Sequence, residues 1–385
     1  MSPQPDRVGA VAAAAPPRRA LRDQLRAWRD RLLASPGFQR GAARFPLTRP
    51  IARRRARALF DLTAGFVYSQ VLFACVQLRL FERLSAGPVA VTQLAAEWQL
   101  PPEGAGRLLA AAESLGLVER RGEARYGLGE LGAAMLGNPA ISAMVAHHEG
   151  LYQDLNDPVA LLRQRGGTRL AGFWPYAGAD PGSAPPASGA AYSDLMAASQ
   201  QLIADDILAA FSFRRCHHLL DIGGGDGTFA AAVLRRWPGV EATVLDLPPV
   251  AARAKAQFAR SGLDGRARAV GGDMFRDPLP RGADVASLVR VLHDHDDEQA
   301  LALLGAARAA LPPAGRLLIA EPMAATPGAE PAGAAYFGMY LWAMGSGRPR
   351  SAAELAAMAS RAGFSRCREL ATRQPLLVRV LVARP

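Results

Sequence analysis

Short apolar runs and longer amphipathic segments alternate along the second half of the chain, from residue 217 onward. The apolar runs read HHLLDIG, VEATVLDL, ADVASLVRVL and GRLLIAE, and segments with helical spacing such as DGTFAAAVLRRW lie between them. Strands that alternate with helices in this way are typical of an α/β fold with a doubly wound, mainly parallel sheet. Two further apolar runs flank Gln374 and Pro375, which predicts an antiparallel pair of strands at the edge of that sheet.

The first half of the chain is predicted to be mostly helical. Residues 58–84 are apolar on every side of a helix, and such a helix is normally buried, here between two subunits. Residues 85–136 show two short helices, a strand that ends at Glu119, a polar turn and a return strand at Tyr126, which is the pattern of a winged helix. Residues 178–190, rich in Pro, Gly, Ser and Ala, predict a loop before the α/β part.

The net charge of +11 is concentrated at the N-terminus. Residues 1–57 hold 14 of the 45 basic and 3 of the 34 acidic residues, so the 31 of each that remain leave residues 58–385 without net charge. Within the basic segment, apolar residues at helical spacing predict an amphipathic helix able to lie on an anionic membrane surface. These residues are Leu21, Leu25, Trp28 and Leu32. The competing interpretation is a solvated, partly ordered extension.

The pattern divides the chain into four predicted parts. These are a basic, partly disordered extension (1–57), a helical winged-helix part suited to dimerisation (58–177), a loop (178–190) and a ligand-binding α/β domain (191–385). Three scattered cysteines without metal-ligand spacing indicate a reduced compartment, and the N-terminal arginines follow their apolar stretch, the wrong order for a secretory signal. No unbroken apolar run reaches the roughly 18 residues of a membrane span. We therefore expect a cytoplasmic protein, and peripheral membrane association through the basic extension stays a hypothesis beside the solvated extension.

A winged helix beside a basic extension also raises the hypothesis of a DNA-binding regulator. The segment at the position of a recognition helix, residues 101–116, holds one Arg and two Glu. That composition is poor for contacts with phosphates. We therefore expect no nucleic-acid partner.

A glycine-rich turn follows the first strand of the α/β part, in the sequence LLDIGGGDG. Gly223, Gly224, Gly225 and Gly227 leave the backbone bare where a strand passes into a helix, so a ligand can touch backbone N–H groups. Thr228 stands where the fingerprint G-x-G-x-x-G needs its last glycine, which weakens the case for a nicotinamide dinucleotide. The turn predicts a nucleotide-like ligand, and a tight structural turn is the alternative.

Acidic residues end the next two strands. Asp246 lies 23 positions after Gly223, where a carboxylate can accept both hydroxyls of a ribose. In GGDMF, Asp273 could accept from an adenine amino group, and Met274 offers a polarisable face to the ring. Capping of the following helix is the alternative role for Asp246, and an aspartate at a strand end, such as Asp273, is common.

His293 comes just after the fourth strand, beside the crevice in which ligands bind in open α/β sheets. Because imidazole titrates near neutrality, His293 is a candidate general base. Glu321, at the end of the fifth strand, could hold the His293 ring in its reactive tautomer, and a capped strand end is the alternative. The residues from Asp294 to Asp297 are assigned to the start of the next helix, where acidic side chains favour the positive helix end.

These motifs occur in the order found in the S-adenosylmethionine-dependent small-molecule O-methyltransferases. They are LLDIGGGDG, VLDLP, GGDMF, LVRVLHDHDDEQ, GRLLIAEPM and RPRSAAELAAMASRAGF, and the chain resembles the caffeate and acetylserotonin enzymes from about residue 60 to its end. The resemblance implies a class I, Rossmann-like methyltransferase domain, an N-terminal winged-helix dimerisation domain, a homodimer, and S-adenosylmethionine as methyl donor. The segment LFDLTAGFVYSQVLFACVQLRLFERL is most similar to the carotenoid-pathway members of phototrophic bacteria. Those enzymes methylate the tertiary 1-hydroxyl of acyclic hydroxycarotenoids of the demethylspheroidene and hydroxyneurosporene type.

Residue by residue, the resemblance implies His293 as the general base and Glu321 as one of its supporting acids. The implied cofactor-binding set is Asp221, Gly223, Gly225, Asp246, Leu247, Asp273, Met274 and Arg290. Two positions depart from the family: its tryptophan after the His-Asp pair is His295 here, and its second supporting glutamate falls at about Pro349. The carboxylate support of His293 is therefore incomplete.

The acceptor is predicted to be a lipophilic small molecule in an apolar pocket. The predicted pocket residues are Met196, His147, Tyr340 and Met344, for which ordinary core packing is the competing role. A phenol, a polyketide and a tetrapyrrole carbon are the alternative acceptors. No metal site is expected, because the neighbouring His147 and His148 point about 100° apart on a helix and no third ligand is evident.

Overall fold

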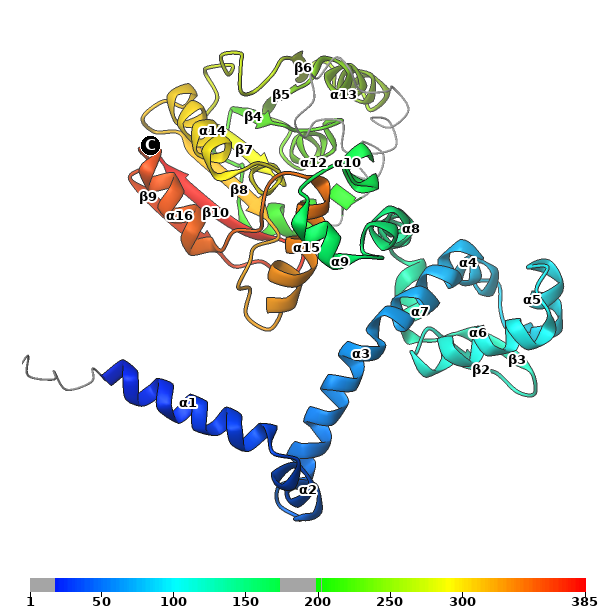
Figure 1. Ribbon diagram of the computed structural model, residues 1–385. Coiled ribbons are helices and arrows are strands. Elements are labelled where there is room, and N and C mark those ends of the chain that lie inside the picture. The colour runs from blue at the N-terminus through cyan, green and yellow to red at the C-terminus, as the bar shows by residue number, and fades with distance from the viewer. Residues whose placement is uncertain (1–17, 174–198, 202) are drawn as a thin grey trace, which may run out of the picture. The chain divides into compact units, whose positions relative to one another are not determined.

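A computed structural model of the protein describes residues 18–173, 199–201 and 203–385 (Figure 1). The chain divides into two compact units, Met1–Leu72 and Phe73–Pro385. The sequence boundary between the basic extension and the following part was expected at residue 57, whereas the boundary between the compact units lies within a helix.

The described part of the first unit, from Arg18 onward, is helical. Helix α1 spans Arg18–Ala34, α2 spans Pro36–Arg44, and α3 begins at Arg49. Ser35 ends the first helix and begins the second, because its hydroxyl accepts a hydrogen bond from the Phe38 N–H and Pro36 occupies the first helical position. The predicted amphipathic helix is present in α1, where Leu21, Leu25 and Trp28 are exposed.

The apolar segment expected over residues 58–84 forms two helices. Helix α3 (Arg49–Gln77) ends before Arg79, which has a left-handed φ of 51°, and α4 (Leu80–Leu84) follows. Of the residues of α3, only Cys75 is buried within the described chain. The described residues of a single chain therefore do not cover this helix, although the sequence predicted that it is buried. Although no unbroken apolar run has the length of a membrane span, α3 is apolar and long enough by composition to cross a membrane. Helices covered by protein pass the same test.

The predicted winged-helix pattern is present. Helices α5 (Val91–Glu97) and α6 (Pro102–Ser114) lie between β1 and β2 of an antiparallel sheet with the order β1-β3-β2, and α7 follows this sheet. The remaining bounds are Val89–Ala90 for β1, Val118–Arg120 for β2, Arg125–Leu128 for β3 and Glu130–Leu136 for α7. The short strand β1, which pairs with β3, had no signal in the sequence pattern.

A group of helices from distant parts of the sequence packs together beside the sheet domain. It contains α8 (Pro139–Asp154), α9 (Pro158–Arg163), α10 (Arg169–Phe173), the π-helix η2 (Ala332–Phe337) and α15 (Gly338–Met344). Leu151, Leu161 and Leu170 bury their side chains against Tyr340 and Leu341. The helices that precede the α/β part thus share a core with a segment that lies late in it.

The α/β part contains a seven-stranded sheet with the order β6-β5-β4-β7-β8-β10-β9 (Figure 1). The first five strands in that order are parallel, and β10 and β9 are antiparallel at the edge, so the predicted doubly wound sheet and its terminal pair are confirmed. The strands are β4 (His218–Ile222), β5 (Glu241–Asp246), β6 (Ala267–Gly271), β7 (Val285–Val289), β8 (Arg316–Glu321), β9 (Arg366–Leu370) and β10 (Arg379–Arg384).

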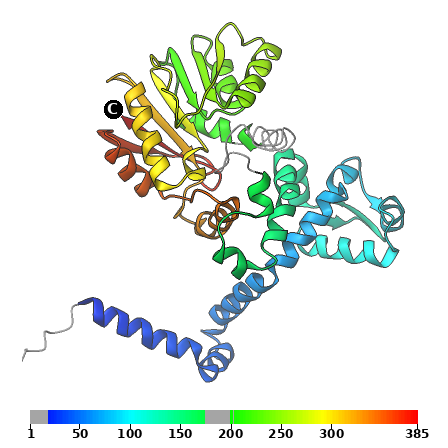
Figure 2. The ribbon, with the colours of Figure 1, turned by 45° about the horizontal axis from the view of Figure 1, so that its top comes forward.

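Helices cover both faces of this sheet, as Figures 1 and 2 show. Helices α12 (Thr228–Arg236) and α13 (Pro248–Arg260) cover one face, and α14 (Asp297–Ala310) and α16 (Ala352–Arg361) cover the other. Successive strand residues point to opposite faces, so Leu219 joins the core under α12 and α13 whereas Leu220 joins the core under α14 and α16. Strand order reverses between the neighbours β4 and β7, and a crevice for a ligand is expected at their carboxyl ends.

Candidate active site

The glycine-rich turn forms one wall of the crevice at the carboxyl end of β4. Gly223 and Gly225 have φ values of 65° and 63°, which glycine adopts without strain. A Cβ atom on Gly223 would lie 3.0 Å from Val291 Cγ2 and 3.8 Å from Met274 Sδ. The bare backbone at Gly223 therefore lies beside two of the neighbouring strand ends, with Met274 where the sequence placed it.

Asp246 braces the glycine turn. One of its carboxylate oxygens accepts a hydrogen bond from the Gly225 N–H and the other from the Leu247 N–H, both at 2.8 Å. Helix α13 has no side-chain cap, so these bonds are not the helix capping considered as the alternative. Each carboxylate oxygen keeps a further lone pair for a ligand hydroxyl. Burial raises the pKa of Asp246 to about 6, although both N–H groups favour the charged form.

Asp221 lies in β4, two residues before Gly223, and is fully buried. Its Oδ1 accepts a 2.6 Å hydrogen bond from the Ser287 hydroxyl, whereas its Oδ2 has no hydrogen-bond partner among the described residues. Burial raises the pKa of Asp221 to about 7. A buried carboxylate with an unused acceptor oxygen suits a ligand that brings a cation or an N–H group.

Asp273 is held in a local turn after β6. Its Oδ1 accepts a hydrogen bond from the Phe275 N–H at 2.9 Å, and its Oδ2 lies 3.5 Å from Arg276 Nε. The next side chain, Phe275, meets the His295 ring edge-on at 4.8 Å between centroids. The contacts of Asp273 and Met274 with an adenine stay predictions.

His293 lies in the 3-10 turn η1 (Leu292–Asp294) that follows β7. Its backbone N–H donates a 3.1 Å hydrogen bond to Glu321 Oε1, at the end of β8. Its ring Nδ1 lies 3.9 Å from the same oxygen and makes no hydrogen bond with any residue that the structure describes. Glu321 therefore stands behind the His293 ring as predicted, but its bond in this structure is to the backbone.

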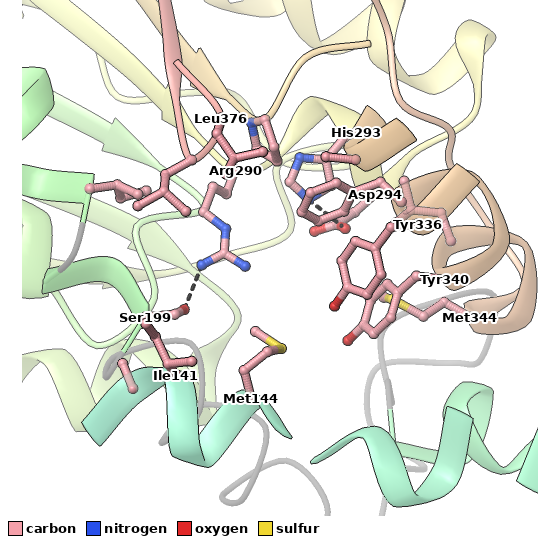
Figure 3. Close-up of a pocket in the computed structure, with 17 residues that line it drawn as sticks. Ile141, Met144, Ser199, Arg290, His293, Asp294, Tyr336, Tyr340, Met344 and Leu376 are labelled. Carbon is pink, nitrogen blue, oxygen red and sulfur yellow. Dashed lines mark hydrogen bonds and ion pairs between the residues drawn. The ribbon is translucent and has the colours of Figure 1, made fainter. Parts of the chain in front are cut away.

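The assignment of residues 294–297 to the start of a helix is wrong for Asp294. Its Oδ1 lies 3.1 Å from His293 Nε2, and its side chain is buried and lines the pocket (Figure 3). Helix α14 begins later, after Asp296. The sequence pattern hid Asp294 because it stands in a run of acidic residues whose other members do lie at that helix start.

The two carboxylates control the charge of His293. Burial alone would lower the pKa of His293, but Asp294 and then Glu321 outweigh burial and the nearby Arg290, and hold this pKa above its usual value. Burial raises the pKa of Glu321 against the opposing attraction of His293. The imidazole is thus surrounded by groups that stabilise its protonated form.

Arg290 projects from the end of β7 into the pocket (Figure 3). Its backbone has a left-handed φ of 57°, and its N–H donates a 2.8 Å hydrogen bond to the Ala320 carbonyl. Its guanidinium donates a hydrogen bond to the Ser199 hydroxyl. An unusual backbone conformation thus aims a cation into the crevice.

An apolar pocket of about 340 Å³ opens beside His293. Figure 3 shows Ile141 and Met144 of α8 on one side and Tyr336, Tyr340 and Met344 on another. Its further lining residues are Ala140, Ser199, Ile203, Arg290, His293, Asp294, Pro322, Ala332, Phe337, Leu341, Leu376 and Leu377. Tyr340 and Met344 were predicted to line the pocket, and both do. Met196 was also predicted, and it lies outside the described residues.

The two histidines of α8 lie behind the aromatic wall. His147 Nε2 is 2.9 Å from the Tyr340 hydroxyl, and His148 Nε2 is 2.7 Å from the Tyr336 hydroxyl. His147 was expected to line the pocket, but it borders the pocket through Tyr340. Burial lowers the pKa of His147 to about 4, and His148 lowers it further in the same direction. Both tyrosine hydroxyls are engaged by neutral groups, so the rings present apolar faces to a ligand.

Sequence reasoning missed the pocket residues contributed by α8 and by the C-terminal segment. Ile141 and Met144 lie about 150 residues before His293, and Leu376 lies after it. No sequence motif marks these residues, because they come from separate elements and meet only in the folded pocket. Over the described residues, no group of three or more His, Cys, Asp or Glu is placed to hold a metal ion.

Comparisons with known proteins give the arrangement a context. Residues 152–365 match the O-methyltransferase domain, and residues 60–138 match the O-methyltransferase dimerisation domain. Demethylspheroidene O-methyltransferase of Cereibacter sphaeroides is 45% identical over 337 residues, which cover 87% of this chain and 88% of that protein. Acetylserotonin O-methyltransferase of Mus musculus is 36% identical over 345 residues, which cover 84% of this chain and 87% of that protein.

Solved structures show the same architecture. Human N-acetylserotonin methyltransferase in complex with S-adenosylmethionine superimposes with a TM-score of 0.71 at 25% identity, over 86% of this chain and 97% of that chain. The mitomycin 7-O-methyltransferase superimposes equally well, over 87% of this chain and all of that chain.

Proposed function

The chain belongs to the S-adenosylmethionine-dependent O-methyltransferase family, and from that premise we propose that it methylates the tertiary 1-hydroxyl of an acyclic hydroxycarotenoid. The observation that carries the proposal is an apolar pocket next to His293, in a chain 45% identical to a demethylspheroidene O-methyltransferase. A phenol, a polyketide and a tetrapyrrole carbon stay alternative acceptors for this fold.

The residues of the crevice fit the methyl donor. The bare Gly223–Gly225 turn and the half-buried Asp246 suit an adenosine, since the carboxylate can accept from both ribose hydroxyls. Asp221 offers a buried acceptor oxygen that has no partner among the described residues, and Arg290 offers a cation in the wall of the pocket. When bound, S-adenosylmethionine supplies a methyl group that its sulfonium has already activated. Leu247, Asp273 and Met274 complete the proposed binding set.

His293 is proposed to accept the proton of the acceptor hydroxyl as the new C–O bond forms. An aliphatic tertiary alcohol is a poor acid, so complete removal of its proton before transfer would be steeply uphill. Asp294 and Glu321 stabilise the imidazolium that results, as a carboxylate does for the histidine of a catalytic triad. The pocket walls are proposed to hold the hydroxyl in line with the methyl group. Alignment of this kind lowers the activation barrier by roughly 7–11 kcal/mol in well-oriented systems, which is more than the base contributes.

The Asp294→Asn variant tests the role of the carboxylate beside the ring. Turnover is expected to fall about tenfold or more, because hydrogen bonds to charged groups contribute roughly 1.5–3 kcal/mol each. The acid limb of the kcat profile is also expected to move to lower pH, since Asp294 raises the pKa of His293. The measurement is kcat between pH 5 and 9, with Glu298→Gln, an exposed charge removal on α14, as the control. An unchanged acid limb in Asp294→Asn would contradict the assignment.

The acceptor class is tested with the purified enzyme. A 1-hydroxycarotenoid in mixed micelles with S-adenosylmethionine is expected to give a product heavier by one methyl group, which mass spectrometry detects. A saturated 1-hydroxylated terpenoid and a phenol are the comparison acceptors. The proposal fails if the carotenoid is recovered unchanged under conditions in which the phenol is converted.

We further propose that two copies of the chain pair through α3. Leu59, Phe60, Leu62 and Phe66 are exposed in the described chain, and the last three of them lie inside the match to the dimerisation domain. Contiguous apolar side chains of this kind favour an interface. The molar mass in solution is expected to be twice 40.7 kDa, and a monomeric mass at micromolar concentration would contradict the proposal.

The basic extension is proposed to hold the enzyme on an anionic membrane surface, where a lipophilic substrate resides. In α1, Leu21, Leu25 and Trp28 are exposed, with arginines between them. Deletion of residues 1–57 is expected to reduce co-sedimentation with vesicles that contain phosphatidylserine. The triple change of these apolar residues to serine keeps the charge and is expected to give an intermediate loss. Unchanged sedimentation of the deletion variant would count against the membrane role.

A further inference from the structure

A loop from a distant part of the sequence lies along the loop that carries His293. This return loop, residues 345–351, follows α15 and precedes α16. The Arg348 N–H donates a 2.9 Å hydrogen bond to the His293 carbonyl, and the Ser346 hydroxyl donates a 2.7 Å hydrogen bond to the Asp294 carbonyl. Gly347 has a φ of 78°, and a Cβ atom there would lie 2.1 Å from the His293 carbonyl oxygen. The two loops therefore fit closely only because this residue is glycine.

Arg350 is the centre of this contact, and its side chain is fully buried. Its Nη1 donates to the Leu292 carbonyl at 2.7 Å, and its Nη2 donates to the His295 carbonyl at 2.8 Å. Its Nε and Nη2 also bond Asp297 Oδ1, at 3.0 and 2.7 Å. One planar guanidinium thus binds the backbone just before His293, the backbone two residues after it, and the start of α14.

We propose that Arg350 is a positioning residue, which holds the His293 loop so that the imidazole lies between Asp294, Glu321 and the pocket. This inference rests on the proposed role of His293 as the base. The second supporting carboxylate of the family falls at about Pro349 here, so the ring lacks that contact. In its place the adjacent Arg350 fixes the backbone that carries the ring.

The energetics favour a role in geometry over a role in stability alone. A buried guanidinium loses its hydration, and here its partners are two carbonyl oxygens and one carboxylate that is itself largely exposed. Apolar residues in such a position are often as stabilising as the buried ion pair. The planar guanidinium holds its N–H donors in fixed directions, and a lysine ammonium does not reproduce this arrangement.

The Arg350→Lys variant tests this role, because it keeps the charge and loses the fixed donor directions. A displacement of about 1 Å at a reacting group can cost roughly 10²-fold in rate, so kcat is expected to fall about 30- to 100-fold. The dissociation constant for S-adenosylhomocysteine, measured by calorimetry, is expected to stay within about threefold, since Arg350 does not touch the glycine turn. A change in affinity and kcat by equal factors would indicate general damage and overturn the proposal.

The pH profile provides a readout that a structural role would not move. The charged groups that face His293 are Asp294, Glu321 and Arg290, and the two carboxylates hold its pKa above the usual value. Loosening the loop weakens these contacts, so the acid limb of kcat is expected to move to lower pH in Arg350→Lys. An acid limb at the wild-type position, together with wild-type kcat, would overturn the proposal.

Matched variants separate positioning from folding. Arg348 bonds the same carboxylate, Asp297, and also Glu354, but its side chain is partly exposed. Arg348→Gln keeps the backbone bond to His293 and is expected to leave kcat within about twofold. If Arg350→Lys does not fold, the Asp297→Asn variant tests the same role, because it removes the carboxylate that Arg350 binds. A fall in kcat of about fivefold, with the acid limb of the kcat profile at lower pH, supports the positioning role. An unchanged kcat overturns it. If His293→Gln retains turnover while Arg350→Lys loses it, the proposed base is wrong and Arg350 acts otherwise.

Discussion

Turnover of the His293→Gln variant is expected to fall by about 10²–10⁴-fold, which is the usual contribution of a positioned general base. Affinity for S-adenosylmethionine is expected to stay within about threefold. Glutamine has a similar size and keeps a polar end, but it cannot accept a proton. The His293 side chain lines the apolar pocket, whereas Asp246 and Gly225, which are proposed to bind the nucleoside, are not among the residues that line it, so the change is expected to leave cofactor binding in place.

Single-turnover kinetics with saturating S-adenosylmethionine measure this step directly. His295→Gln is the matched control, because His295 is a near neighbour that does not line the pocket. Its turnover is expected to stay within a few-fold. Weakened cofactor binding with unchanged turnover per bound complex would contradict the assignment of His293 as base.

The pH dependence of turnover gives the same role an independent signature. The base must be neutral to accept a proton, and Asp294 and Glu321 hold the pKa of His293 above its usual value against the effect of burial. Turnover is therefore expected to rise with pH through that raised pKa and to fall as pH drops below it. In His293→Gln this limb of the profile should be absent.

The Asp246→Asn variant is expected to raise the dissociation constant of S-adenosylmethionine about 10²-fold. Two hydrogen bonds to a charged acceptor, at roughly 1.5–3 kcal/mol each, are weakened when the carboxylate becomes an amide. Turnover per bound complex is expected to stay near the wild-type value, because the proposed role of Asp246 is to bind the ribose and not the reacting groups. Calorimetric titration measures the affinity. Equal affinity in the variant and the wild type would remove Asp246 from the binding set.

Asp284→Asn is the matched control for that variant. Asp284 also accepts hydrogen bonds from two backbone N–H groups, those of His217 and His218, but it lies at the opposite end of the sheet. The affinity of this control is expected to be unchanged. A common loss in both variants would indicate a general effect on the fold.

Protonation of Asp246 should weaken cofactor binding in the wild type as well. Burial raises its pKa to about 6 in the free protein, and the hydroxyls of a ribose bind the charged form more strongly. Affinity is therefore expected to fall as pH decreases through about 6, and this component should be absent from Asp246→Asn. Asp221, with a pKa of about 7, adds a further component that the variant retains.

The sequence predicted the α/β part well because its signals are local. Each strand shows its apolar run, the glycines mark the first turn, and Asp246 and His293 follow strand ends. Parallel strands bring their carboxyl ends to one edge of a sheet, so the order of the motifs along the chain was enough to predict that these distant residues share that edge.

The parts that escaped prediction depend on contacts without local signals. Asp294 looks like a helix-start residue, and only the 3-10 turn at Leu292–Asp294 directs it to the His293 ring. Arg350 lies 58 residues from Leu292 along the chain, and no pattern connects them. The exposed face of α3 was expected to be buried, and the chain by itself does not cover it. A sequence shows that such a segment is apolar, but not whether its own chain or another molecule covers it.

The central claim is that the pocket beside His293 accepts an acyclic hydroxycarotenoid. The most direct measurement is a competition in which the enzyme transfers a labelled methyl group from S-adenosylmethionine to an equimolar mixture of a 1-hydroxycarotenoid and a phenol. Label is predicted in the methyl ether of the carotenoid, in excess over the phenol, and its rate of appearance is predicted to fall by about 10²-fold or more in His293→Gln. Label in the phenol while the carotenoid stays unlabelled would contradict the claim.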